Sequence, residues 1–146
     1  MKKTSMMFLF SASLAILAST LYHVFQKNTP GDVNPALSLL VTYATAAVAT
    51  LGLLVFYPPQ NLGQDLAKLN WASYALGLGI VGLELGILLA YRAGWQISLL
   101  GLVVNIAAAL LLLPVGLIFF REKLTPLNLL GIGLCILGLI LVNWRR

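Results

Sequence analysis

The 146-residue sequence has few charged residues, one cysteine and one histidine. Charged residues make up 9% of the chain, whereas a soluble globular domain carries about 25%, so this chain could not cover a surface facing water. One cysteine permits no internal disulfide and no cysteine-based metal site. No nucleophile–base pair and no phosphate-binding glycine loop is present. We therefore expect no catalytic residues, no metal, no cofactor and no enzymatic activity.

The residues that are abundant define the class of protein. Hydrophobic residues make up 60% of the chain and the mean hydropathy is +0.97, which excludes disorder. Nine lysines and arginines against four acidic residues give a net charge of +5. Because the basic residues form no run or stripe, we expect no nucleic-acid partner. The sequence predicts a multi-pass protein of the inner or plasma membrane whose surroundings are the lipid bilayer.

Five apolar stretches are long enough to cross a bilayer core, which takes about 20 helical residues. Asparagine or threonine precedes three of them as a predicted helix cap, with proline following at Pro35 and Pro126. We therefore predict one all-α transmembrane domain over residues 1–146, a bundle of five helices. The predicted spans are about 6–25, 36–57, 71–91, 97–120 and 127–144.

Two segments outside this pattern leave alternatives. Residues 1–20 resemble a secretory signal, but the apolar run continues into Leu21 and Tyr22, so we expect the segment to be retained. The long connection 58–70 places three leucines on one helical face. That pattern fits a short helix in the membrane interface, and an irregular solvated loop is nearly as consistent with it.

The basic residues orient the predicted helices only weakly. With five spans, the side of the N-terminus collects five basic residues and the other side collects four. The positive-inside rule acts through this difference. One interpretation is a weak preference for a cytoplasmic N-terminus. The other is insertion in both orientations, which would give an antiparallel homodimer.

Glu84 is the single acidic residue within a predicted span. At 1.5 Å per residue it lies roughly 10 Å from the Tyr91 end of its helix and roughly 20 Å from Trp71. A carboxylate at this depth costs at least a few kcal/mol unless it is neutralised, paired or hydrated. Glu84 is therefore a candidate binding residue for a substrate or a proton; the alternative is a carboxyl group that holds helices together.

Four further polar residues lie in the same half of the membrane on neighbouring spans, two of them at a depth similar to that of Glu84 and two, on the first span, nearer the surface. They are Tyr22, His23, Thr42 and Asn105, and with Glu84 they predict a polar layer in one half of the membrane. Depth does not show that they face one another. Thr42 and Asn105 equally suit ordinary interhelical hydrogen bonds, and His23 suits either a partner of Glu84 or an interfacial residue.

Small residues and a proline suggest where helices approach or bend. Pro114 should kink the fourth span. Two small-residue faces predict helix packing within or between chains: Gly82, Gly86 and Ala90, and Gly131, Cys135 and Gly138.

The stretch from Gly79 to Asn143, somewhat under half the chain, carries a family resemblance. It contains a span with a late Pro-Val, a Glu-Lys-Leu-Thr turn and a final span with glycines seven apart. In this order they resemble a repeat of the drug/metabolite transporter superfamily, EamA type. The elements are Pro114-Val115, residues 122–125, Gly131 and Gly138.

The resemblance implies how the chain would function. Most members have ten helices in two inverted five-helix repeats, so a single repeat implies a dimer, with the antiparallel arrangement an open alternative. It implies a secondary transporter that exports a small organic solute, with or without proton coupling. The helices that line the cavity in relatives would place Tyr22, Glu84 and Asn105 near the pathway.

Small multidrug resistance relatives carry their carboxylate in the first helix, whereas Glu84 is on the third, so the charge of the substrate and the coupling to protons stay open. The alternatives are a non-transporting subunit of a heteromeric complex and a flippase for a lipid-linked substrate.

Overall fold

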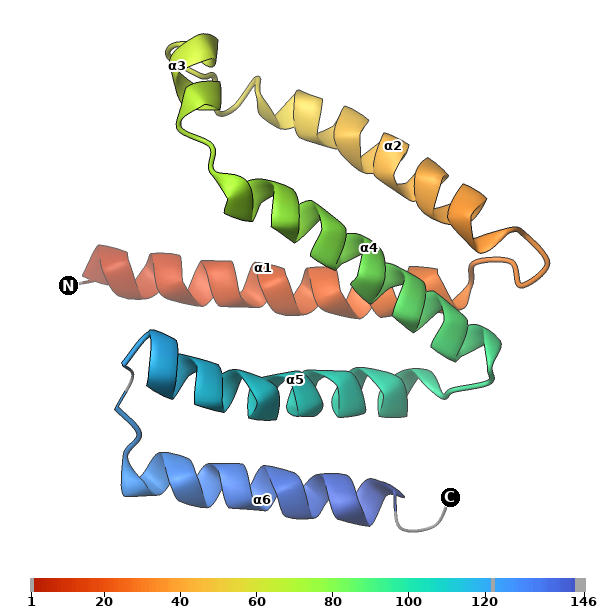
Figure 1. The fold of residues 1–146 in the computed structure, drawn as a ribbon, viewed down its shortest axis with the longest axis vertical. Coiled ribbons are helices and arrows are strands. Elements are labelled where there is room, and N and C mark those ends of the chain that lie inside the picture. Colours follow the sequence, from red (N-terminus) through yellow and green to blue (C-terminus); the bar gives the residue numbers. More distant parts are fainter. Residues whose placement is uncertain (1, 122, 144–146) are drawn as a thin grey trace. The chain divides into compact units, whose positions relative to one another are not determined.

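In the computed structural model, residues 2–121 and 123–143 are described, and every regular element within these ranges is a helix (Figure 1). The bundle predicted from the sequence is thus all-helical where it is described. The helices are α1 Lys2–Lys27, α2 Pro35–Leu53, α3 Leu62–Ala67, α4 Trp71–Arg92, α5 Ile97–Phe119 and α6 Pro126–Asn143.

Side-chain caps start the helices where the sequence predicts them. The Asn34 side chain accepts hydrogen bonds from the backbone N–H groups of Ala36 and Leu37, and Pro35 occupies the first turn of α2. Asn70 caps α4 in the same way. The Thr125 hydroxyl accepts from the Asn128 N–H at the start of α6. These bonds satisfy N–H groups that have no partner within the helix.

Four helices of the described chain are long and apolar enough to cross a membrane. They are the segments Met6–Lys27, Pro35–Leu53, Trp71–Arg92 and Ile97–Phe119. The apolar stretch of α6, Pro126–Val142, is shorter, so the fifth span remains a prediction. Its predicted end at Trp144, the two terminal arginines and Glu122 lie outside the described residues.

The second helix ends earlier than the predicted boundary at residue 57. Residues 54–57 are apolar, yet α2 stops at Leu53. Tyr57 precedes Pro58, and a residue before proline is disfavoured in the helical region. The connection that follows contains the six-residue helix α3, capped by Asn61. The helix predicted there is confirmed; its position in the membrane interface stays a prediction.

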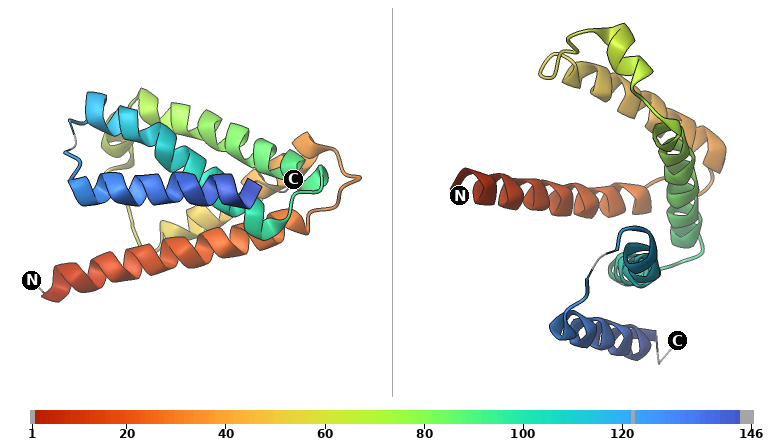
Figure 2. Two further views of the ribbon diagram at one scale, coloured as in Figure 1. Left: turned by 90° about the horizontal axis from the view of Figure 1, so that it is seen from below. Right: turned by 60° about the vertical axis from the view of Figure 1, so that its left-hand side comes forward.

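The chain forms two compact units, Met1–Gly94 and Trp95–Arg146. In the first, α4 contacts both α1 and α2 (Figures 1 and 2). Its buried side chains are few, namely Leu39 of α2 and Ile87, Leu88 and Tyr91 of α4. Most of the other large apolar side chains are exposed. Helices that are apolar on all sides and exposed suit a lipid environment.

The second unit is the helix pair α5 and α6, which contact each other. α5 continues as one helix through Pro114. A groove of about 520 Å³ lies between the two helices, and its lining includes Asn105, Asn128 and Cys135. It is otherwise apolar.

Candidate functional site

Glu84 lies on the face of α4 that also carries Leu88 and Tyr91. The spacing of four and seven residues places these side chains on one side of the helix, and Leu88 and Tyr91 are both buried. Glu84 is partly buried. Its Oε2 atom is buried and has no hydrogen-bond partner among the described residues.

The last turns of α1 supply the neighbours of Glu84 on one side. The Gln26 side-chain amide donates a hydrogen bond of 3.2 Å to the backbone carbonyl of Glu84. Tyr22, one turn earlier, interacts electrostatically with the Glu84 carboxylate. The Tyr22 hydroxyl oxygen is buried and, within the described chain, has no hydrogen-bond partner.

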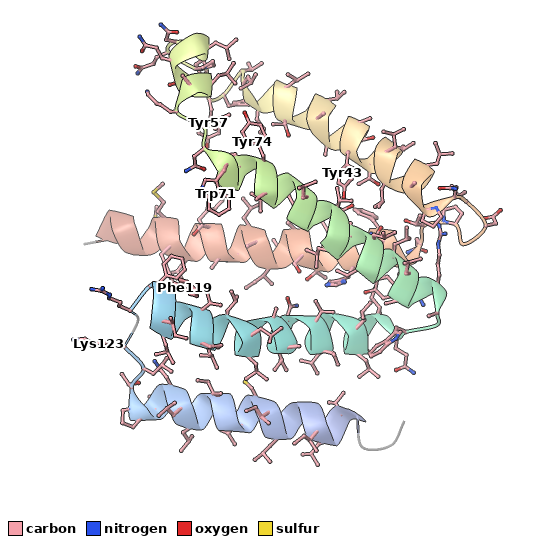
Figure 3. The ribbon with its side chains drawn as sticks, in the orientation of Figure 1. Tyr43, Tyr57, Trp71, Tyr74, Phe119 and Lys123 are labelled. Atoms are coloured by element: carbon pink, nitrogen blue, oxygen red, sulfur yellow. The ribbon has the colours of Figure 1, made fainter. Side chains whose placement is uncertain are left out.

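The middle of α2 supplies a second tyrosine. Tyr43 points from α2 toward α4 (Figure 3) and interacts electrostatically with Glu84. Its hydroxyl oxygen is also buried without a hydrogen-bond partner in the part of the chain that is described. With Leu39 and Leu85 it lines a groove of about 460 Å³ between α2 and α4.

His23 pairs with Tyr91 and not with the Glu84 carboxylate. Its Nδ1 lies 2.9 Å from the Tyr91 hydroxyl oxygen, and the two rings meet edge to face. Which of the two groups donates depends on the histidine tautomer. The His23 ring also meets the Tyr22 ring edge to face, with centroids 5.4 Å apart. His23 therefore joins α1 to α4.

The other two predicted site residues are described each within its own unit. Thr42 is exposed, and its hydroxyl donates to the Ser38 carbonyl of its own helix. Asn105 is exposed and lines the groove between α5 and α6 in the other unit. We refer below to Tyr22, Gln26, Tyr43 and Glu84 as the Glu84 cluster.

The Glu84 cluster contains three buried oxygen atoms that have no hydrogen-bond partner in the described ranges, one from a carboxyl group and two from phenols. Leaving a buried polar group unpaired costs about 1–3 kcal/mol, and more for a charged one. A bound cation, a proton or a ligand N–H group would satisfy these oxygens. No group of three metal-ligating side chains occurs among the described residues.

Tyr43 and Gln26 are the cluster residues that the sequence analysis missed, and Tyr43 is the one whose buried oxygen has no partner among the described residues. Helical spacing offers one signal, since Leu39 and Tyr43 are four residues apart and therefore share a face. That face is buried at Leu39. The sequence does not show which face of an entirely apolar helix is buried, so this signal becomes readable only with the structure.

Comparison with known families confirms the family resemblance. The model of the EamA-like transporter family matches residues 6–144. No curated protein and no solved structure matches the chain. The family match covers nearly the whole chain, including every helix that contributes to the Glu84 cluster. The chain therefore belongs to the EamA-like transporter family and is a multi-pass membrane protein of a transporter type.

Proposed function

We propose that the protein is a secondary transporter of the cell membrane that exports a small organic solute, with Glu84 as the residue that binds a cationic substrate or a proton. The observation that carries this proposal is the buried Oε2 of Glu84, which has no hydrogen-bond partner among the described residues. Two tyrosine hydroxyl groups in the same cluster share this property.

The cost of burial explains why such a site would bind a cation. A carboxylate within the hydrocarbon core costs at least a few kcal/mol unless something neutralises it. An organic ammonium ion would neutralise the charge, and the aromatic faces of Tyr22 and Tyr43 would add cation–π attraction. A proton would neutralise the same carboxylate. Competition between the two for one group couples their fluxes and yields antiport.

A dimer of five-helix repeats would complete the pathway. The chain supplies one repeat in a single membrane domain. The predicted spans divide its basic residues almost evenly between the two sides of the membrane. A Cβ atom added at Gly82 or Gly86 would meet nothing within 4 Å, which leaves this small-residue face open for another helix. Asn105 and Thr42 would line the pathway in the assembled dimer.

The test is uptake of organic ammonium ions into proteoliposomes, driven by a pH gradient. We expect Glu84→Gln to abolish pH-driven uptake while the purified protein keeps its helical circular dichroism. Asp65→Asn is the matched control, because Asp65 lies outside the spans in α3 and pairs with Lys68 at 3.2 Å. Undiminished transport by Glu84→Gln would remove the coupling role. Stable purification with a different polypeptide, without transport, would instead favour a partner subunit.

A further inference from the structure

A small polar cavity lies where α1 and α4 end, apart from the Glu84 carboxylate. Its volume is about 180 Å³, and the side chains that line it include Lys27, Thr29, Tyr91 and Arg92. Lys27 and Arg92 are the last residues of two candidate membrane spans. The cavity therefore lies at the end of the apolar segments, where lipid headgroups begin.

Two cationic side chains are held in the wall of this cavity. The Arg92 guanidinium donates from Nη2 to the Pro30 carbonyl at 3.0 Å. The Lys27 ammonium lies 3.5 Å from the Tyr91 carbonyl oxygen and 5.3 Å from the centre of the Tyr91 ring. Both charges are thus positioned by contacts with the protein.

Arg92 has a donor that no described residue uses. Its Nε atom is buried and has no hydrogen-bond partner among the described residues. No carboxylate in the described ranges pairs with Arg92; the ion pair found there joins Lys68 and Asp65. An unpaired donor on a charged group is costly when buried, so the position calls for an oxygen acceptor from outside the chain.

A simpler explanation accounts for only part of this arrangement. Cations at the C-terminal end of a helix offset its dipole, and long basic side chains reach from a span toward the interface. Both effects explain why a lysine and an arginine end these helices. Neither explains a cavity between them or a buried Nε without a partner.

We infer that this cavity binds a phosphate group at the membrane surface. Small-molecule sites usually have volumes of about 300–1,000 Å³, so a cavity of about 180 Å³ suits a single headgroup better than a whole solute. Phosphate oxygens match the planar donor set of arginine. Basic pockets between transmembrane helices bind phosphate headgroups by this chemistry. The group comes either from an anionic phospholipid or from free phosphate.

The experiment measures thermal unfolding of the full chain in neutral detergent. Phosphatidylglycerol, phosphatidylcholine and inorganic phosphate are titrated separately at constant ionic strength. We expect phosphatidylglycerol to stabilise the protein at lower concentrations than phosphatidylcholine does. Stabilisation by inorganic phosphate alone would support the site and identify free phosphate as its source. No preference for phosphatidylglycerol and no effect of phosphate would overturn the inference.

Two arginine variants distinguish binding in the cavity from a general effect of positive charge. Arg92→Gln should weaken the apparent affinity for the stabilising ligand about tenfold or more, which corresponds to about 1.4 kcal/mol. Arg121→Gln, the same change at an exposed residue after α5, should leave the affinity unchanged. If Arg92→Gln does not fold, Lys27→Gln replaces it with the same expectation. If the folded variant, Arg92→Gln or Lys27→Gln, binds the ligand as tightly as the unchanged protein does, the proposal is wrong.

Discussion

Two tyrosines of the first unit, Tyr91 of α4 and Tyr43 of α2, differ in what they contribute to folding. The Tyr91 hydroxyl is hydrogen-bonded to His23, whereas the Tyr43 hydroxyl has no partner among the described residues. The first contributes to the packing of α4 against α1. The Tyr43 hydroxyl makes no such contribution to folding. A ligand that forms a hydrogen bond with an unpaired hydroxyl of this kind would gain the most binding free energy.

Tyr43→Phe should therefore affect transport more than stability. Removing an unpaired buried hydroxyl is neutral or slightly stabilising, because its desolvation cost disappears. We expect the unfolding midpoint to stay the same or rise, and the apparent KM for the transported cation to increase severalfold. Thermal unfolding and proteoliposome uptake measure the two effects. A clearly lower midpoint would mean that the hydroxyl has a structural partner after all.

The pair formed by His23 and Tyr91 should show the opposite behaviour. Tyr91→Phe keeps the ring and removes the hydroxyl, so it should cost about 0.5–1.5 kcal/mol of stability. A double-mutant cycle with His23→Phe isolates the interaction, since the second change should cost less once the first has been made. Strictly additive losses in reversible unfolding would contradict the hydrogen bond.

How far the site could be predicted depends on the residue. Glu84 stands out because it is the single acid in a span, and its depth places it near Tyr22 and His23. Tyr43 and Thr42 are adjacent in the sequence, yet successive helical residues point about 100° apart. The structure turns Tyr43 toward α4 and leaves Thr42 exposed. In a helix that is apolar on all sides, the sequence does not distinguish these two faces.

At the scale of helices, their starts were easier to predict than their ends. Asn34, Asn70 and Thr125 cap their helices as expected, because a cap is a local interaction between residues two or three apart. The end of α2 at Leu53 was predicted too late because apolarity continues to residue 57. Hydropathy shows which residues are stable in the membrane. The end of the helix depends instead on the backbone conformations that Pro58 allows to the residue before it.

Asn34→Ala tests the contribution of one cap. The Asn34 side chain accepts from two backbone N–H groups, at 2.8 and 3.3 Å. Losing an asparagine cap costs about 1 kcal/mol, so we expect a lower unfolding midpoint without loss of the other helices. Asn28→Ala is the control, because Asn28 follows α1 and donates to the Val24 carbonyl without capping a helix start. Equal destabilisation by both changes would argue against a capping effect.

At the scale of the whole molecule, we expect the division of basic residues to govern orientation. With the five predicted spans the division is five against four, a difference too small to fix one orientation strongly. Gln60→Lys together with Gln64→Lys adds two charges to the predicted N-terminal side. We expect this double variant to adopt one orientation with a cytoplasmic N-terminus. Labelling of a cysteine placed near the N-terminus, in a Cys135→Ser background, reports the orientation in intact cells.

The unmodified chain provides the comparison for this experiment. Labelling from both sides before the change, and from one side after it, would support insertion in two orientations. In that case the double variant alone should also lose transport, because it could no longer form antiparallel pairs. One-sided labelling of the unmodified chain would instead require a parallel dimer or a different partner.

The position of α4 also sets the order in which the protein can assemble during synthesis. In the described chain α1 and α2 each contact α4 but not each other. The end of α4 follows the end of α1 by about 65 residues, and a ribosome adds about 5–20 residues per second. α1 therefore waits about 3–13 s in the bilayer for the helix that it and α2 both contact, and α2 waits a shorter time. A nascent chain released before residue 71 would leave two separate spans, with Tyr22 and His23 facing lipid, as a substrate for membrane quality control.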